Sequence, residues 1–247
     1  MAGRRRLDAE LVRRGLVPTV DDAKAAVGSG QVLVAGAPAS NPGRLVGAGE
    51  PVTLRASPPT YVSRGGRKLE AALDGFRLRP AGLRCLDAGA STGGFTDCLL
   101  QRGAAHVVAV DVGRGLLHER LRADPRVTLL ERTNVRALEL GERFALVVAD
   151  LSFISLRTVA PALVAHAAGD LVLLVKPQFE AHRAEAARGR GVVTDPAVHE
   201  RVVEEVAGAF ARLGAAKMGV MRSPVTGADG NVELLLHLSV GERAGGA

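Results

Sequence analysis

Two charged residues stand directly after apolar segments in the second half of the chain. Asp150 follows Val147-Val-Ala, and Lys176 follows Leu173-Leu-Val. Such apolar segments predict buried strands of a parallel sheet, and polar residues after them face the crevice where ligands bind. A lysine at the end of an apolar strand needs an acidic partner, which Asp150 on the adjacent strand can supply. We expect a reactive pair here, and a plain salt bridge at the sheet rim is the alternative.

A glycine-rich turn lies upstream, in the segment Cys85-Leu-Asp-Ala-Gly-Ala-Ser-Thr-Gly-Gly-Phe-Thr96. A turn from a strand into a helix lets the backbone approach a ligand and offers the helix's first N–H groups to a carboxylate or phosphate. Its Gly-x-x-x-Gly-Gly spacing differs from the Gly-x-Gly-x-x-Gly of dinucleotide binders, and acidic Asp87 suits an ammonium better than a pyrophosphate. The turn indicates S-adenosylmethionine, with a tight strand–helix connection as the alternative. The candidate cofactor contacts in this turn are Asp87, Gly89, Ser91, Thr92, Gly93, Gly94 and Phe95.

Further cofactor contacts are expected at the ends of other strands. Asp111 follows the strand Val107-Val-Ala-Val, 24 residues after Asp87. An acid at this position accepts both hydroxyl groups of a ribose, although it could instead cap the next helix. Asn134, after a third strand, would lie near the adenine, and Asp150 would also face the cofactor.

Lys68 and Glu233 complete a possible constellation of charged residues. Lys68 lies at the start of the sheet-forming part of the chain, and Glu233 interrupts the apolar segment Val232-Glu-Leu-Leu-Leu. A glutamate in an apolar strand needs a partner. Taken alone, Lys68 could contact phosphate or solvent, and Glu233 could face solvent from an edge strand.

Alternating strands and helices must position these residues, and their pattern predicts an α/β fold with a Rossmann-like, doubly wound sheet of seven strands. The expected strands lie near residues 83–88, 106–111, 126–130, 144–149, 170–176, 216–222 and 232–239. Only Ser223–Asn231 separates the last two, which is too short for a crossover helix, so we expect an antiparallel hairpin. An amphipathic helix over residues 68–77 precedes the sheet.

The first part of the chain predicts a small α+β module. Helices over residues 7–15 and 21–28, the second capped by Asp21, precede strands at 31–34 and 52–54. Pro58-Pro59 marks a linker. We therefore expect an N-terminal domain at residues 1–58, a linker at 59–64 and a second domain at 65–247.

Positive charge is concentrated at the beginning of the chain. The net charge is +6, and residues 1–68 hold eleven Lys and Arg against five Asp and Glu, which leaves 21 of each sign in the remainder. Arginine-rich composition alone would explain abundant positive charge, but not its confinement to one part of the chain. The excess favours a polyanionic partner.

Composition also limits the class of protein. Cys85 and Cys98 lie in apolar company, which predicts buried, inert thiols and no metal site. No apolar segment follows the N-terminal arginines, and none reaches the length of a membrane span. We therefore expect a cytoplasmic protein without membrane contact.

Five ordered motifs together resemble one known family. They are Ser63-Arg-Gly-x-x-Lys68-Leu, Asp87-Ala-Gly-Ala-Ser-Thr-Gly-Gly-Phe-Thr96, Asp150-Leu-Ser-Phe-Ile-Ser155, Val175-Lys-Pro-Gln-Phe-Glu180 and Gly230-Asn-Val-Glu233. This order resembles the TlyA, or hemolysin A, family of ribosomal RNA 2′-O-methyltransferases, and the similarity spans nearly the whole chain. The resemblance implies an S4-like RNA-binding domain followed by an FtsJ-like, S-adenosylmethionine-dependent methyltransferase domain.

The resemblance also implies roles for residues. The family's Lys-Asp-Lys-Glu catalytic tetrad corresponds to Lys68, Asp150, Lys176 and Glu233. The implied substrate is the 2′-hydroxyl of cytidines in 16S and/or 23S ribosomal RNA, and the implied partners are the ribosomal subunits. The expected RNA contacts are Arg4, Arg5, Arg6, Arg13, Arg14, Arg64 and Arg67. Leu116 stands where the family usually has a polar glutamine, so cofactor contacts near it are in question.

Two other functions stay open at this point. A nicotinamide-dependent oxidoreductase would share the fold, although the glycine spacing argues against it. A non-catalytic ribosome-assembly factor would keep the fold without the chemistry, although an intact Asp150 and Lys176 argue against that. The sequence gives the hemolysin label no support and leaves the target nucleotide and the oligomeric state open.

Overall fold

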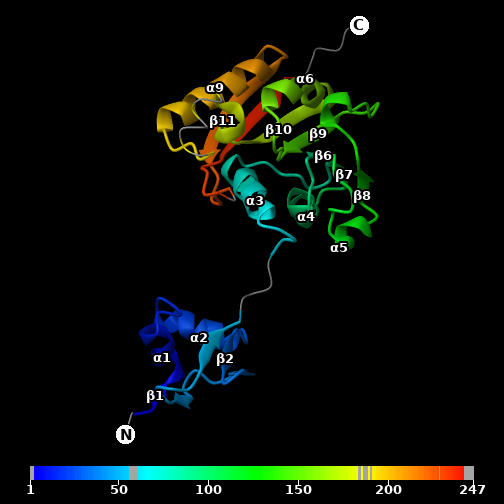
Figure 1. Cartoon of the computed structure of the whole chain (residues 1–247). Coiled ribbons are helices and arrows are strands. Elements are labelled where there is room, and N and C mark those ends of the chain that lie inside the picture. Colours follow the sequence, from blue (N-terminus) through cyan, green and yellow to red (C-terminus); the bar gives the residue numbers. More distant parts are fainter. Residues whose placement is uncertain are drawn as a thin grey trace. The chain divides into compact units, whose positions relative to one another are not determined.

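Figure 1 shows the computed structural model of the chain, which describes residues 3–55, 60–182, 185, 189, 191–227 and 229–241. The chain forms two compact units, Met1–Pro59 and Thr60–Ala247. Each unit has its own buried core, so each is described by itself.

The N-terminal unit packs two helices on short strands. The helices are α1 (Leu7–Arg13) and α2 (Val20–Gly28), and the strands are β1 (Arg5–Arg6), β2 (Val32–Val34), β3 (Ala37–Pro38), β4 (Leu45–Val46) and β5 (Val52–Leu54). The two expected strands are present as β2 and β5, which pair with each other in an antiparallel manner. The expected cap of α2 is wrong, because Thr19 is its N-cap and accepts the backbone N–H of Asp22, whereas Asp21 lies inside the helix. The β1–β4 and β3 pairings were not predicted, since strands this short carry no alternation pattern.

The C-terminal unit contains the predicted seven-stranded sheet, in the order β11-β12-β10-β9-β6-β7-β8. Its strands are β6 (Arg84–Ala88), β7 (His106–Val110), β8 (Val127–Leu130), β9 (Phe144–Ala149), β10 (Ala167–Val175), β11 (Ala215–Arg222) and β12 (Leu234–Val240). Strands β6 to β10 run parallel, while β12 is antiparallel to both β10 and β11. The expected antiparallel final hairpin is therefore confirmed.

Helices cover both faces of this sheet (Figure 1). Helices α6 (Leu156–His166) and α9 (Pro196–Ala211) bury one apolar face, and α3 (Gly65–Gly75), α4 (Gly94–Gln101) and α5 (Glu119–Arg122) bury the other. The shorter elements are η1 (Val135–Ala137) and α7 (Pro177–Glu180). Because the interior strands are apolar on both faces, they read as continuous hydrophobic segments in the sequence.

Some element boundaries differ from the sequence-based expectation in ways that affect the site. Helix α3 begins at Gly65, so Lys68 lies in its first turn rather than at its start. Strand β12 begins at Leu234, so Glu233 precedes the strand instead of lying within it. The apolar residues on both sides of Glu233 predicted a strand through it. In the structure its side chain is buried, but its backbone belongs to the preceding loop.

Both cysteines are free and buried, as expected, and burial raises the pKa of the Cys85 and Cys98 thiols to about 12. Among the described residues, no group of His, Cys, Asp or Glu has the arrangement of a metal site. In the same part of the chain, no helix has the length and apolar character needed to cross a membrane.

Candidate active site

The carboxyl ends of β6, β9 and β10 surround a cavity of about 580 Å³. Its walls come from five segments, at residues 63–68, 89–95, 150–153, 176–179 and 225–233, together with Gly191. All of them belong to the C-terminal unit. Four of the five motifs singled out in the sequence reach the cavity at a strand end or a helix start, as an open α/β sheet requires of a ligand site.

The predicted pair of Lys176 and Asp150 is present at this cavity. Lys176 follows β10 and Asp150 follows the neighbouring parallel strand β9, so that Lys176 Nζ lies 2.6 Å from Asp150 Oδ1. Lys176 Nζ also donates to Ser152 Oγ at 2.9 Å and lies 5.9 Å from the centre of the Phe179 ring. An ammonium has three N–H donors. Lys176 uses two of its N–H donors for Asp150 and Ser152, which leaves one N–H for a ligand.

A second buried ion pair lines the cavity. Lys68 Nζ on α3 lies 2.5 Å from Glu233 Oε2, and their side chains are 10% and 3% exposed. Gly227 lies against this carboxylate, because a Cβ at Gly227 would be 3.1 Å from Glu233 Oε1. The partner that Glu233 requires is therefore Lys68, and neither residue has the solvent-facing position that was the alternative.

The glycines of the turn serve packing against protein atoms as well as the cavity. A Cβ at Gly89 would be 2.5 Å from the carbonyl oxygen of Asp150. A Cβ at Gly94 would be 2.3 Å from Ser63 Oγ, and one at Gly93 would be 2.3 Å from Leu121. Gly89 and Gly93 also have φ angles of +86° and +97°. The expectation that these glycines make room for a ligand is therefore incomplete, since their side-chain space is filled by the chain itself.

Asp87 lies beneath this turn and is completely buried. Its Oδ2 accepts a hydrogen bond from Thr96 Oγ1 at 2.6 Å, whereas its Oδ1 has no hydrogen-bond partner. Burial raises the pKa of Asp87 to about 7, and the nearby Asp150 carboxylate adds to this, against the lowering effect of Thr96. An ammonium group or an ordered water would satisfy the unpartnered oxygen.

Asp111 connects the glycine turn to the loop after β7. Its Oδ2 accepts the backbone N–H of Ser91, and its Oδ1 accepts that of Gly113, each at 2.7 Å. Each carboxylate oxygen can accept a second hydrogen bond, so both remain able to accept from a ligand. The next residue, Val112, is 67% exposed and offers an apolar surface there that the sequence reasoning missed.

The other expected cofactor contacts separate into two groups. Ser91, Thr92 and Phe95 line the cavity. Asn134 does not, because it is exposed and its side chain accepts the N–H of Arg136 as the cap of η1. Leu116 is also outside the cavity and lies in a separate depression lined by residues 114–119, Arg122 and Glu131.

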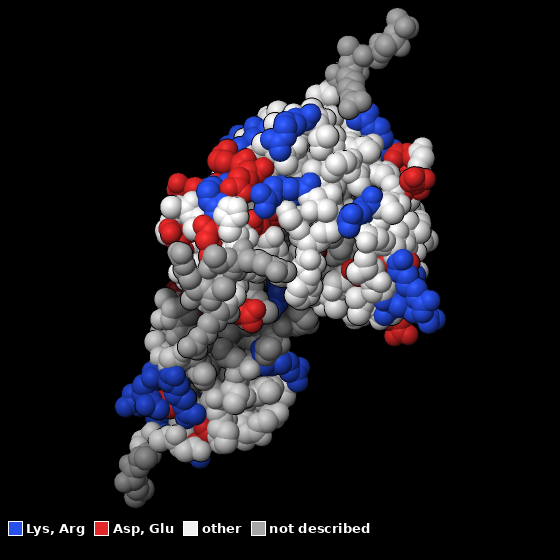
Figure 2. All heavy atoms as spheres, turned by 45° about the horizontal axis from the view of Figure 1, so that its top comes forward, with Lys and Arg blue, Asp and Glu red and all other residues white. Residues whose placement is uncertain are grey.

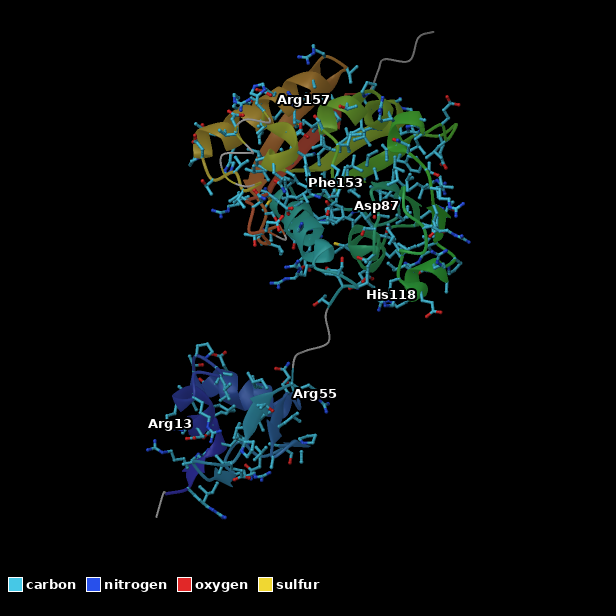
Figure 3. The ribbon with its side chains drawn as sticks, in the orientation of Figure 1. Arg13, Arg55, Asp87, His118, Phe153 and Arg157 are labelled. Atoms are coloured by element: carbon cyan, nitrogen blue, oxygen red, sulfur yellow. The ribbon has the colours of Figure 1, made fainter. Side chains whose placement is uncertain are left out.

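Some cavity residues lie within the quoted motifs but were given no role of their own in the sequence analysis, among them Ser152, Phe153, Gln178 and Phe179. Phe153 is 91% exposed with a φ of +64°, and its ring centre lies 5.2 Å from that of Phe179. Figure 3 labels Phe153 in the C-terminal unit, together with Asp87. The amide oxygen of Gln178 is buried without a partner. The sequence signal that could have identified Phe153 is an aromatic residue in the loop that follows strand β9.

The arginines that were expected to contact RNA differ in solvent exposure and in ion pairing. Arg4 and Arg5 are exposed, and Arg64 and Arg67 are exposed on or beside α3. Figure 2 shows more Lys and Arg than acidic side chains on the visible face of the N-terminal unit. Several of these are nevertheless in ion pairs, since Arg6 pairs with Asp8 and Arg13 with Glu10.

Arg14 is a correction to this set. Its guanidinium donates to Glu10 and to the carbonyl oxygens of Gly47, Ala48 and Glu50, and its side chain is only 20% exposed. These bonds use four of its five N–H donors within the unit, so Arg14 holds the loop before β5 on α1 and is less available to RNA than an exposed arginine. The N-terminal unit, residues 1–59, holds eight basic and five acidic residues. Its positive excess is therefore smaller than that of residues 1–68.

Known proteins match most of this chain in sequence. The family model described as FtsJ-like methyltransferase matches residues 61–240, and the S4 domain model matches residues 5–52. TlyA of Mycobacterium tuberculosis, named as a 16S/23S rRNA (cytidine-2′-O)-methyltransferase, is 52% identical over 96% of this chain and 91% of its own length. The chain belongs to the TlyA family.

More distant relatives of this TlyA-family chain agree. TlyA of Campylobacter jejuni, named as a 23S rRNA (cytidine-2′-O)-methyltransferase, is 35% identical over 72% of this chain and 70% of its own length. A solved structure of a Streptococcus thermophilus protein named as a hemolysin has a TM-score of 0.72 and 39% identity, and covers 97% of this chain and 90% of that one. The family and fold expected from the motifs are thereby confirmed.

Proposed function

We propose that this chain transfers a methyl group from S-adenosylmethionine to the ribose 2′-hydroxyl of cytidines in ribosomal RNA. The observation that carries the proposal is the meeting of Lys176, Asp150, Lys68 and Glu233 at one cavity of an FtsJ-like domain. The curated relatives named above act on cytidine 2′-hydroxyls of ribosomal RNA, and the full-length match to one of them supports the same substrate here.

The residues around the glycine turn fit S-adenosylmethionine. Asp87 offers an unpartnered carboxylate oxygen toward an ammonium or its water, and Asp111 can accept ribose hydroxyls. Exposed Val112 gives the adenine an apolar surface. When bound, S-adenosylmethionine supplies a methyl group on a sulfonium, which is already a strong electrophile. The chain must therefore mainly align the acceptor oxygen and manage its proton.

Lys176 is the residue placed to manage that proton. Asp150 and Ser152 hold its Nζ in one position, and its remaining N–H can reach a ribose oxygen in the cavity. As a neutral amine, Nζ presents a lone pair in place of this N–H and receives the proton of the 2′-hydroxyl; as an ammonium, it keeps the N–H and stabilises the negative charge that develops on the oxygen while the proton leaves to water. Lys68 and Glu233 form the facing wall and fix the ribose relative to Lys176.

The target nucleotide must leave its stack to bring its ribose into the cavity. Phe153 offers an exposed ring at the cavity mouth, on which an unstacked base can stack. Its ring leans on Phe179, and its backbone has a φ that few non-glycine residues adopt, so the exposed position is imposed by the loop. Arg64 at the cavity and Arg67 on α3 are available to the RNA backbone.

A direct test uses the full chain with ribosomal subunits that lack the modification. After incubation with radiolabelled S-adenosylmethionine, the RNA is digested to nucleosides and the labelled nucleoside is identified by mass spectrometry. We expect label in 2′-O-methylcytidine from both subunits, since the 52% identical relative bears the dual name. Label only in a base-methylated nucleoside, or binding of NAD in place of S-adenosylmethionine, would contradict the proposal.

A further inference from the structure

Glu180 is a buried acidic residue that the proposed chemistry does not use. It is 3% exposed and ends α7, the short helix that begins directly after Lys176. It does not line the cavity. A buried carboxylate is costly unless hydrogen bonds satisfy it, so its partners show what the structure gains from it.

All of those partners belong to the start of α6 and the loop before it. Glu180 Oε2 accepts from Ser155 Oγ and Oε1 accepts from the backbone N–H of Leu156, both at 2.6 Å. Arg157 adds an ion pair to Oε2 at 3.3 Å and donates to the carbonyl oxygen of Glu180 at 2.8 Å. Ser155 is itself the N-cap of α6. The carboxylate therefore binds the N-terminal turn of α6, where negative charge is stabilised.

The loop held in this way carries the groups that surround Lys176. It runs from Asp150 to Ser155 and includes Ser152, which accepts from Lys176, and Phe153, which contacts Phe179. At the start of the loop, Asp150 pairs with Lys176, the N-cap of α7. At the end of the loop, Ser155 bonds to Glu180, the last residue of α7. Between these ties Phe153 is held in a strained backbone conformation, which persists only where the surroundings fix it.

We propose that Glu180 is a positioning residue for methyl transfer: by anchoring Ser155 and Leu156 it sets the loop that places Ser152 against Lys176 and Phe153 at the cavity mouth. This inference rests on the proposed function. It differs from a purely structural role, in which Glu180 would contribute to folding while the rate of the folded protein stayed unchanged. A misplacement of catalytic groups by about 1 Å is enough to lower a rate on the order of 100-fold.

The test compares four variants of the full chain in single-turnover methylation, with S-adenosylhomocysteine affinity and thermal stability measured alongside. Glu180→Ala removes every side-chain tie. Ser155→Ala removes the hydroxyl hydrogen bond to Glu180 together with the N-cap of α6, and serves if Glu180→Ala does not fold. Glu180→Gln can still accept from Leu156 and donate to Ser155. Val206→Ala, in the buried face of α9, lowers stability by a substitution outside the loop and outside the cavity lining.

We expect Glu180→Ala to lower the single-turnover rate by about 10-fold to 100-fold at an unchanged S-adenosylhomocysteine affinity. Ser155→Ala should lower it less, and Glu180→Gln should restore most of it. Amide hydrogen exchange over residues 150–156 should quicken in Glu180→Ala and stay normal in β6. Val206→Ala should methylate at the wild-type rate while folded.

A wild-type rate in folded Glu180→Ala, or an equal loss of rate in an equally destabilised Val206→Ala, would overturn the inference. Wild-type protein that methylates no ribosomal RNA would instead contradict the proposed function. In that case the exchange measurement still decides whether Glu180 holds the loop, and unchanged exchange over residues 150–156 would overturn the anchoring role.

Discussion

Lys68 and Glu233 form an ion pair in the wall of the cavity, although one lies in the first helix of the C-terminal unit and the other immediately before its last strand. Both side chains are almost completely buried. Removing one member of a buried pair leaves a charge without compensation, whereas apolar replacement of both members is often tolerated. The pair thus allows stability and activity to be separated.

Glu233→Leu alone should destabilise the protein by about 3 kcal/mol, because Lys68 is left buried without its partner. Combining it with Lys68→Met should recover most of that stability in denaturant unfolding. The double variant should nevertheless methylate ribosomal RNA at a strongly reduced rate. Full activity in the stable double variant would show that the pair only supports the fold.

Asp111→Ala should weaken cofactor binding. Loss of the carboxylate removes its hydrogen bonds to ribose hydroxyls and frees the N–H groups of Ser91 and Gly113, at a cost of about 1–3 kcal/mol of affinity. Calorimetric titration with S-adenosylhomocysteine measures this. Asp124→Ala is a suitable control, because Asp124 also accepts a backbone N–H but lies before β8, whereas Asp111 follows β7 at the carboxyl end of that strand. Equal affinities of the two variants would contradict the assignment of Asp111.

Asp87 should make stability depend on pH. Its folded pKa of about 7 is above its unfolded value of 3.8, so folding favours the protonated form. The resulting stability is complete below the unfolded value and is lost as the pH rises through about 7. Asp87→Asn should therefore melt at a higher temperature than wild type above about pH 7, by about 5 °C, and lose this advantage at lower pH. A melting temperature of Asp87→Asn below that of wild type throughout this range would contradict a costly buried charge.

Arg4 and Arg5 should contribute to RNA affinity through phosphates. Both are exposed and form no ion pair with the described residues. Replacing both by glutamine should weaken ribosomal RNA binding and reduce the slope of log affinity against log salt by about 1–2. The control is Arg84→Gln, which removes an arginine paired with Glu142 on the C-terminal unit. An unchanged salt dependence of the Arg4 and Arg5 variant would place the RNA contacts elsewhere.

The sequence predicted the strands of the sheet and the pairing of Asp150 with Lys176 because both depend on local patterns. Apolar segments buried on both faces mark parallel strands, and residues after adjacent strands must come together. The exposed ring of Phe153 could not be predicted in this way, because its position depends on the backbone of one irregular loop. The anchoring of that loop by Glu180 depends on contacts between distant segments, which periodicity does not report.

The expectations for the glycines and for Arg14 were incomplete for a related reason. The sequence shows that another group can come close to the backbone of Gly94, because glycine has no side chain. Only the packed structure shows that this group is Ser63. Likewise, an arginine in a basic segment suggests a polyanion contact, but Arg14 is used by carbonyl oxygens of its own unit. In both cases tertiary contacts decide between a ligand and the protein itself.

Single-turnover methylation by Lys176→Ala tests the central claim most directly. Asp150, which loses its partner, is partly exposed, so the variant should remain folded with a small loss of stability. We expect it to bind ribosomal RNA and S-adenosylhomocysteine nearly as wild type does while losing methyl transfer, because Lys176 acts mainly in the transition state. A folded Lys176→Ala protein that methylates its ribosomal RNA at near the wild-type rate would contradict the account.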